Sequence, residues 1–117
     1  MKNYDNFFLG VDNLALAKEY YQTVLGLRIK FDFSNRGMIA FAVGDQEPAI
    51  ILKDRKVFAD AKSAIWFEVE DVRAEYEKLF GKGVRFLSPP FEIATGMAAE
   101  FEDPFGNRFG ITDYTNH

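Results

Sequence analysis

The sequence predicts an α+β fold built from two tandem βαβββ units, residues 1–54 and 64–117. Three observations support this prediction. Short apolar stretches have the length and alternation of strands, two stretches have helical spacing, and the order of these elements repeats along the chain. A polar and charged segment, residues 54–63, suits a linker between the units. With 117 residues, the chain has the length of a single domain.

The first unit begins with an apolar run of strand length and continues into a helix. Asp12 and Asn13 offer a polar N-cap before residues with helical spacing, and Gly26 ends that helix. Residues 27–33 alternate apolar and charged side chains, which predicts a strand with one buried face. The strands of this unit are predicted over residues 6–11, 27–33, 38–43 and 49–53.

The second unit repeats this order. Glu70 and Asp71 offer an N-cap, and the apolar residues that follow lie on one face of a helix that ends near Gly81 and Gly83. The turn "DPFGN", residues 103–107, has the Pro, Gly and Asn of a tight hairpin. The strands of this unit are predicted over residues 64–69, 84–87, 97–102 and 107–113.

An internal duplication explains the repeated order. The segments "GMIAFAVGDQEPAIILKD", residues 37–54, and "GMAAEFEDPFGNRFGITD", residues 96–113, align without a gap and share four identities. The helices and strands that precede these segments recur at nearly the same offset. We therefore expect one unit of about 55 residues to occur twice. The alternative is two unrelated α+β halves.

Composition excludes several classes of protein. The chain has no Cys, which rules out disulfides, thiolate nucleophiles and Cys-based zinc sites. The net charge of −4 and the absence of a basic run argue against a nucleic-acid partner. No apolar run approaches the ~18 residues of a membrane span, and the charged N-terminus does not resemble a signal peptide. We expect a cytoplasmic protein with no membrane partner. The 13 Phe residues indicate an aromatic core or pocket.

Three motifs inside the duplicated units carry a family resemblance: "YYQTVLGL" at residues 20–27, "FEVEDV" from Phe67, and "DPFGN" at residues 103–107. With these three motifs, the chain resembles the glyoxalase, bleomycin-resistance and extradiol-dioxygenase superfamily, also called vicinal oxygen chelate proteins. The resemblance implies curved mixed sheets around an open barrel-like cavity, with the helices outside. It also implies a homodimer and, in metal-dependent members, a divalent ion held by four side chains. These are usually a His or Gln on the first strand and a Glu on the last strand of each unit.

This sequence departs from that ligand set. The four positions read Asn6, Ile51, Ala64 and Gly110, and three of them have no side-chain donor. Asn6 alone is a poor anchor for a transition metal. The only histidine, His117, is the last residue. We therefore expect no metal and no other cofactor.

Strand alternation predicts which side chains line the cavity. On the first and fifth strands, Phe8, Trp66 and Glu68 share a face with the metal-ligand positions, as Arg108 does on the last strand. If Phe41 also faces the cavity, the overlay of the repeats places Glu100 there. The plainer alternatives are that the Phe side chains belong to the core, that Glu100 is solvated, and that Arg108 pairs with Glu100 or Glu68. The candidate ligand-binding residues are Phe8, Phe41, Trp66, Glu68, Glu100 and Arg108, and no catalytic residue is assigned.

An aromatic wall with few polar groups is typical of a small-molecule pocket. Together with the resemblance, it predicts a metal-independent binding protein that sequesters an antibiotic or another planar or cationic compound. The main alternative is an enzyme, a glyoxalase-like lyase or isomerase or a dioxygenase, that uses a divalent metal. Metal-free acid–base catalysis by Glu68 or Glu100, and a regulatory domain with a vestigial pocket, also remain open at this point.

Overall fold

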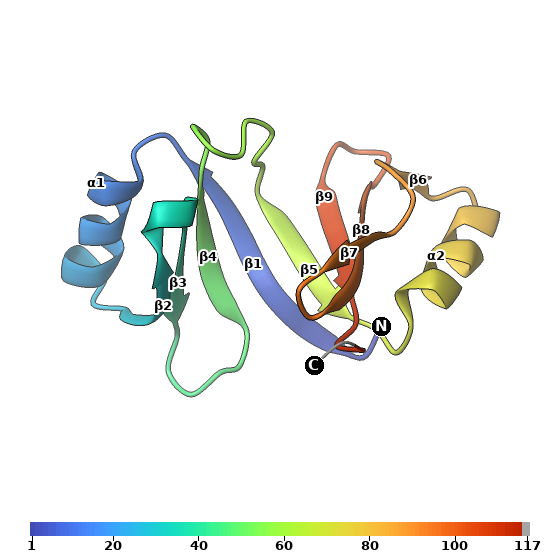
Figure 1. Ribbon diagram of the computed structural model, residues 1–117, viewed down its shortest axis with the longest axis horizontal. Coiled ribbons are helices and arrows are strands. Elements are labelled where there is room, and N and C mark those ends of the chain that lie inside the picture. Colours follow the sequence, from blue (N-terminus) through green and yellow to red (C-terminus); the bar gives the residue numbers. More distant parts are fainter. Residues whose placement is uncertain (116–117) are drawn as a thin grey trace. The chain divides into compact units, whose positions relative to one another are not determined.

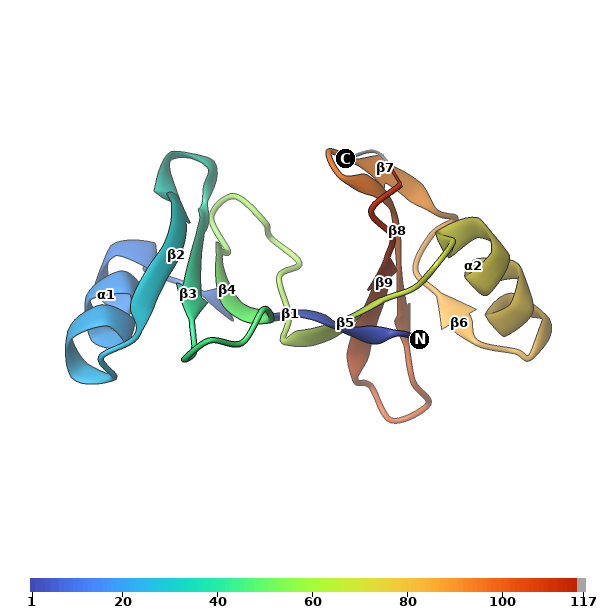
Figure 2. The same ribbon diagram turned by 90° about the horizontal axis from the view of Figure 1, so that it is seen from below.

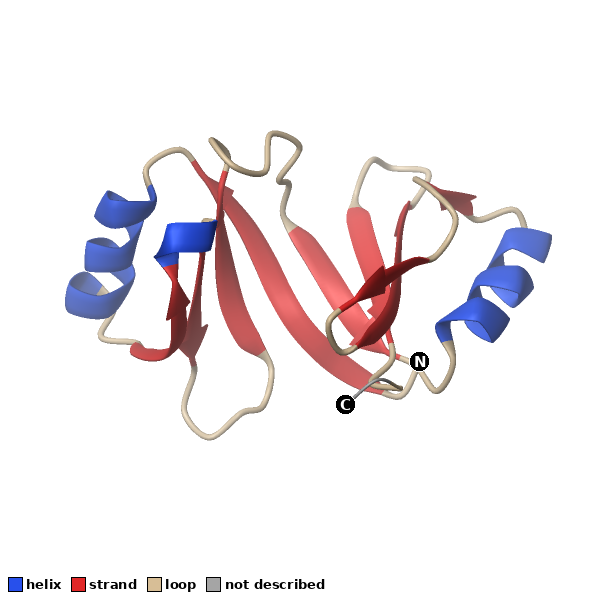
Figure 3. Cartoon of the chain, in the orientation of Figure 1, coloured by secondary structure: helices blue, strands red, loops and turns tan. Residues whose placement is uncertain are grey.

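The computed structural model describes residues 1–115 and confirms the α+β class (Figures 1 and 3). The histidine at position 117 lies outside the described residues. The α-helices are α1 (Leu14–Glu19) and α2 (Val72–Gly81), and a π-helical turn, Tyr20–Val24, extends α1. The strands are β1 (Asn3–Val11), β2 (Arg28–Phe33), β3 (Met38–Ala42), β4 (Ala49–Asp54), β5 (Ala64–Glu68), β6 (Arg85–Phe86), β7 (Phe91–Ile93), β8 (Gly96–Glu102) and β9 (Arg108–Thr112).

The chain divides into two compact units. The first unit is Asn6–Ser63, and the second unit combines Met1–Asp5 with the residues from Ala64 onward. Strand β1 therefore contributes to both units. At its start, the Lys2 N–H donates a 2.8 Å hydrogen bond to the Glu68 carbonyl, while from Phe7 onward the strand pairs with β4. Within the described residues, the hydrogen-bonded strand order runs from β2 to β6 without closing.

In the first unit, four strands form a mixed sheet in the order β2-β3-β4-β1, with β1 parallel to β4. Helix α1 covers one face of this sheet (Figure 1). The core on that side is the cluster of Leu14, Ile39, Phe41 and Leu52. The opposite face carries a second cluster, in which Phe8 packs against Ala40, Ala49 and Ile51.

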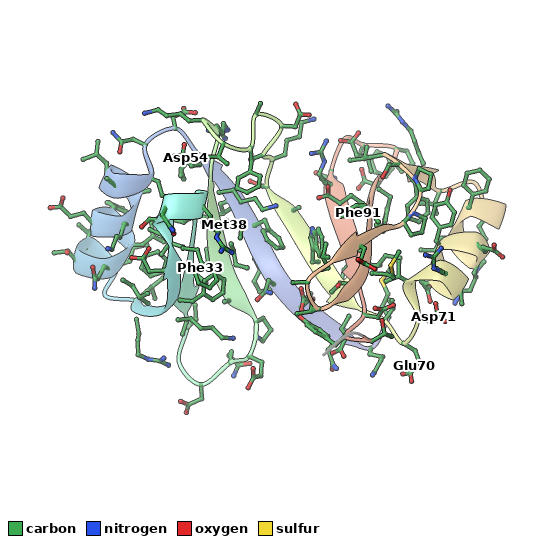
Figure 4. The ribbon with its side chains drawn as sticks, in the orientation of Figure 1. Phe33, Met38, Asp54, Glu70, Asp71 and Phe91 are labelled. Carbon is green, nitrogen blue, oxygen red and sulfur yellow. The ribbon has the colours of Figure 1, made fainter. Side chains whose placement is uncertain are left out.

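A bulge in β2 changes which face its aromatic side chains occupy. The alternation of residues 27–33 predicts that Ile29, Phe31 and Phe33 share one face. The pairing of β2 with β3 shifts between Ile29 and Phe31. As a result, Ile29 packs with the α1 cluster, whereas Phe31 packs on the opposite face, with its ring 4.9 Å from that of Phe33. Phe33 pairs across the strands with Met38 (Figure 4).

In the second unit, the strand order is β5-β9-β8-β6, β5 is parallel to β9, and β7 pairs with β8. Helix α2 covers one face (Figure 2), where Val69, Val72, Ala99 and Ile111 form the core. Phe67, Phe109 and Phe101 stack beside this core with centroid separations of 6.0 and 5.6 Å. Strand β7, which places Phe91 opposite Ala98, is absent from the sequence prediction because it has three residues and follows Pro89-Pro90 (Figure 4).

The strand registers show that the repeats do not align without a gap. Residue 51 pairs with Ala40 on β3, whereas its repeat mate, Gly110, pairs with Glu100 on β8. The cause is the hairpin loop, which spans residues 43–48 in the first unit and the shorter stretch 103–107 in the second. The true repeat mate of Ala40 is therefore Glu100, and that of Phe41 is Phe101.

A buried carboxylate joins three segments of the second unit. Asp113, which is 2% exposed, accepts hydrogen bonds from the backbone N–H groups of Val72 (2.8 Å) and Met97 (2.9 Å) and from the Thr115 hydroxyl (2.8 Å). Gly96 has a φ of +156°, and a Cβ at this position would overlap the Asp113 carbonyl and carboxylate. Only glycine fits here without strain. Through its hydrogen bonds to Val72 and Met97, the Asp113 side chain connects the start of α2 with the start of β8.

Both helices begin at the residues that the sequence predicts as caps. The Asn13 and Asp71 side chains accept from the N–H groups of Leu16 (3.0 Å) and Ala74 (3.2 Å). Figure 4 shows Asp71 where α2 begins. We expect Asp71→Ala to lower the free energy of unfolding by about 1 kcal/mol, because an N–H of the first turn loses its acceptor. Urea denaturation followed by circular dichroism measures this, and Glu77→Ala on the exposed face of the same helix is the control. Equal stability of the two variants would contradict the capping role.

Candidate functional site

The indole of Trp66 lies directly on the backbone of Gly110. The two residues are register partners on β5 and β9, so they face the same side of the sheet, opposite α2. A Cβ at Gly110 would overlap the indole atoms Cε2, Nε1 and Cδ2. Trp66 is 7% exposed. Only a glycine at position 110 permits this contact, and the ring occupies the volume into which a side chain at that position would project.

We call this side of the second unit's sheet the Trp66 face; it comprises Ala64, Trp66, Glu68, Ala98, Glu100, Glu102, Arg108, Gly110 and Thr112. The predicted alternation on β5 and β9 is confirmed, because Phe67, Val69 and Ile111 pack on the α2 side instead.

Glu100 is the charged group nearest to the Gly110 position in the strand register. It lies opposite Gly110 on β8 and is half-buried. Within residues 1–115, its side chain makes no hydrogen bond or ion pair. A carboxylate in this setting lacks a compensating positive charge, and it is available to a cationic ligand.

The other charged side chains of the Trp66 face are already paired. Arg108 forms a 3.2 Å ion pair with Glu102, in which both side chains are largely buried, 13% and 14% exposed. The partner is thus Glu102 rather than Glu100 or Glu68. Glu68 instead lies 3.8 Å from the Lys2 ammonium and accepts a 3.5 Å hydrogen bond from the Asn3 amide. These pairs reduce the capacity of Arg108 and Glu68 to bind a ligand.

The two aromatic candidates of the first unit lie on opposite faces of its sheet. Phe8 pairs in register with Ile51, as Trp66 pairs with Gly110, and the Lys53 ammonium lies 4.7 Å from the centre of its ring. Phe41 does not belong to this face, and its expected inward orientation is wrong. It is fully buried under α1, with its ring 5.5 Å from that of Tyr21. The hairpin loop of the first unit is longer than that of the second, so the residue of β3 that corresponds to Glu100 is Ala40 and not Phe41.

The residues at the family's metal-ligand positions do not fit a metal ion. In the second unit, Ala64 and Gly110 provide no donor, and the Trp66 ring covers Gly110. In the first unit, Ile51 is a core residue, and the Asn6 side-chain oxygen accepts a 2.9 Å hydrogen bond from the Ala49 N–H. Across residues 1–115, no cluster of three or more His, Cys, Asp or Glu side chains is arranged to hold an ion. These four positions therefore lack the set of donor side chains that a bound divalent ion requires.

Comparison with known proteins agrees with this fold. The family model of the Glyoxalase/Bleomycin resistance protein/Dioxygenase superfamily matches residues 3–111, so the chain belongs to this superfamily. An uncharacterized protein of Bacillus subtilis (strain 168), YetH, is 42% identical over 105 residues, which cover 85% of this chain and 88% of YetH. A second protein of that organism, YurT, is 33% identical over 67 residues, which cover 57% of this chain and 53% of YurT.

Solved structures show the same fold at low sequence identity. A Streptomyces coelicolor methylmalonyl-CoA epimerase in complex with 2-nitronate-propionyl-CoA is 17% identical, with a TM-score of 0.75 over 98% of this chain and 99% of that one. The hypothetical protein BH1468 from Bacillus halodurans C-125 is 15% identical, with a TM-score of 0.75 over 97% and 95% of the two chains. Neither helix of the described part of this chain has the length and apolar character needed to cross a bilayer.

Proposed function

We propose that this protein binds a small planar cation at the Trp66 face without the help of a metal ion. The observation that carries the proposal is the position of the Trp66 ring over Gly110, beside the unpaired carboxylate of Glu100. Where metal-dependent relatives would have a ligand side chain, this unit has the indole ring of Trp66, of which 7% is exposed. A ring and a nearby carboxylate favour a ligand that is both flat and positively charged.

The charges of the site support a cation rather than an anion. Arg108 is neutralised by Glu102 at 3.2 Å, so on β5, β8 and β9 the charge of this face that has no partner among residues 1–115 is the negative one on Glu100. Arg85, opposite Glu102 on the edge strand β6, adds an exposed positive charge at the margin of the face. The net charge of −4 adds a weak attraction for cations over the whole chain. Sequestration of such a compound, as the family name of bleomycin resistance suggests, requires binding but no turnover. A lyase or isomerase that depends on a metal is less well supported, because the ligand positions lack donors.

The only tryptophan of the chain provides a direct test. We expect N-methylquinolinium and bleomycin to change the Trp66 fluorescence in a saturable manner, and 1-methylnaphthalene, which is flat but neutral, to bind more weakly. Glu100→Gln should weaken binding of the cation by about fivefold to tenfold, because the counter-charge is lost. Zinc, manganese or EDTA should leave the affinity for N-methylquinolinium unchanged.

Glu92→Gln is the matched control, since Glu92 is exposed on β7 and pairs with Met97 on the α2 side. Isothermal titration calorimetry checks that the fluorescence change reports binding rather than collisional quenching. No saturable response to any of a broad panel of planar cations, or equal affinity of the Glu100→Gln variant and the unaltered protein, would refute the proposal. Metal-dependent turnover in a lyase or isomerase assay would favour the enzyme instead.

A further inference from the structure

A cavity of about 430 Å³ lies at the end of α2, in the second unit, and the proposed Trp66 site does not use it. It is lined by residues 82–85, which follow the helix, and by residues 101–104, at the end of β8 and the turn after it. Small-molecule sites in proteins have volumes of roughly 300–1,000 Å³. We propose that this cavity binds a small aromatic carboxylate, and call it the α2-end cavity.

An aromatic ring forms part of its apolar lining. Phe101 lines the cavity and is held in place by its neighbours, with ring centroids 5.6 Å from Phe109 and 5.4 Å from Phe86. Val84 adds a second apolar side chain to the lining. Because Phe101 is already fixed by stacking, little conformational freedom is lost when a flat ligand packs against it.

The acidic side chains of the lining are already satisfied. Glu102 forms the ion pair with Arg108. The Asp103 carboxylate accepts from the backbone N–H groups of Phe105 (2.8 Å) and Asn107 (2.9 Å) and from the Asn107 side chain (2.9 Å). These hydrogen bonds, that from the Asn107 side chain first, hold the pKa of Asp103 below its usual value. The carboxylates of Glu102 and Asp103 are thus stabilised by donors of the protein itself, and neither requires a bound cation.

The basic side chains of the lining are the ones still available. Within residues 1–115, the side chains of Lys82 and Arg85 make no hydrogen bond or ion pair, and both residues are exposed. The carbonyl end of α2 would itself repel an anion. That end is capped, however, because the Leu79 and Phe80 carbonyls accept from the N–H groups of Lys82, Gly83 and Val84. The lining thus contains two exposed cations without a partner and one aromatic ring, which favours an anionic head group on an aromatic body.

A titration of the full chain with 2-naphthoate, followed by ¹⁵N–¹H correlation NMR, tests this proposal. We expect saturable shifts of the amide signals of residues 82–85 and 101–104, and much weaker binding of the neutral 2-naphthalenemethanol. Lys82→Gln and Arg85→Gln should each weaken 2-naphthoate binding about fivefold, and higher salt should weaken it further.

Arg73→Gln is the control, since Arg73 is an exposed base in the first turn of the same helix and outside the cavity. Signals elsewhere in each variant show that it remains folded. Equal binding of the neutral compound, unchanged affinity in both variants, or shifts centred on Trp66 and Gly110 would overturn the proposal. The Trp66 fluorescence titration uses cations and a different face, so the two proposals can fail independently.

Discussion

Gly110→Ala is expected to lower the free energy of unfolding by about 3 kcal/mol, although it adds only one methyl group. The reason is steric, because the Cβ would overlap three atoms of the Trp66 indole. Neither the backbone of the paired strand nor the buried Trp66 ring can move away from the new methyl group without loss of packing. Urea denaturation followed by circular dichroism measures the change in stability.

A double-mutant cycle shows whether Trp66 is the cause. Trp66→Ala alone should cost about 3–5 kcal/mol, because it leaves a cavity. In that background, adding Gly110→Ala should cost less than about 1 kcal/mol, since the colliding ring is gone. Gly81→Ala is the control, because a Cβ at Gly81 meets no atom within 4 Å. An equal cost of Gly110→Ala in both backgrounds would show that the indole does not occupy this volume.

Asp113→Ala should cost a similar amount, about 3 kcal/mol. The carboxylate accepts from Val72, Met97 and Thr115, and its removal leaves two backbone N–H groups without their acceptor in a buried place. Asp113→Asn keeps the volume but turns one oxygen into a donor, so it should be destabilising by a smaller amount. Thermal and urea unfolding measure both variants, and Asp45→Asn, in an exposed turn, is the control.

The effect of Asp113→Asn should depend on pH. Burial raises the pKa of Asp113, but the hydrogen bonds from Met97, Val72 and Thr115 outweigh it and hold the pKa below the usual 3.8. A carboxyl with a lowered pKa contributes stability above its unfolded-state pKa, and loses it as the pH falls through the folded-state pKa. The stability difference between the protein and the variant should thus be largest near pH 7 and shrink below about pH 4. A difference that stays constant down to pH 2 would contradict this account.

Most elements of the fold could be predicted from local pattern, because strand alternation and helix caps are properties of neighbouring residues. Asn13 and Asp71 mark both helix starts correctly. The elements that escaped prediction depend on tertiary pairing. Strand β7 is too short to show a pattern, and the bulge after Ile29 exists only through pairing with β3.

The candidate site could be predicted only where alternation was enough. It placed Trp66, Glu68 and Arg108 on one face, as the register shows. Alternation left the phase of β3 open, and the inward orientation expected for Phe41 is wrong. The hairpin loop differs in length between the units, so Glu100 corresponds to Ala40 and not to Phe41. The ion pair of Arg108 with Glu102 and the contact of Trp66 with Gly110 depend on cross-strand register, which no single segment of sequence reveals. Whether the six candidates bind a ligand stays a prediction.

The path of β1 determines which residues a separately expressed second unit must contain. Its first residues belong to the second unit, where Tyr4 stacks on Phe67 at 5.7 Å and Tyr114 donates a hydrogen bond to Asp5. A fragment that starts at Ala64 would lack this strand. The backbone N–H and C=O groups at one edge of β5 would then be unpaired, which promotes aggregation. Fusing residues 1–5 ahead of Ala64 through a flexible tether would restore that edge, so an autonomous half must be assembled from both ends of the polypeptide.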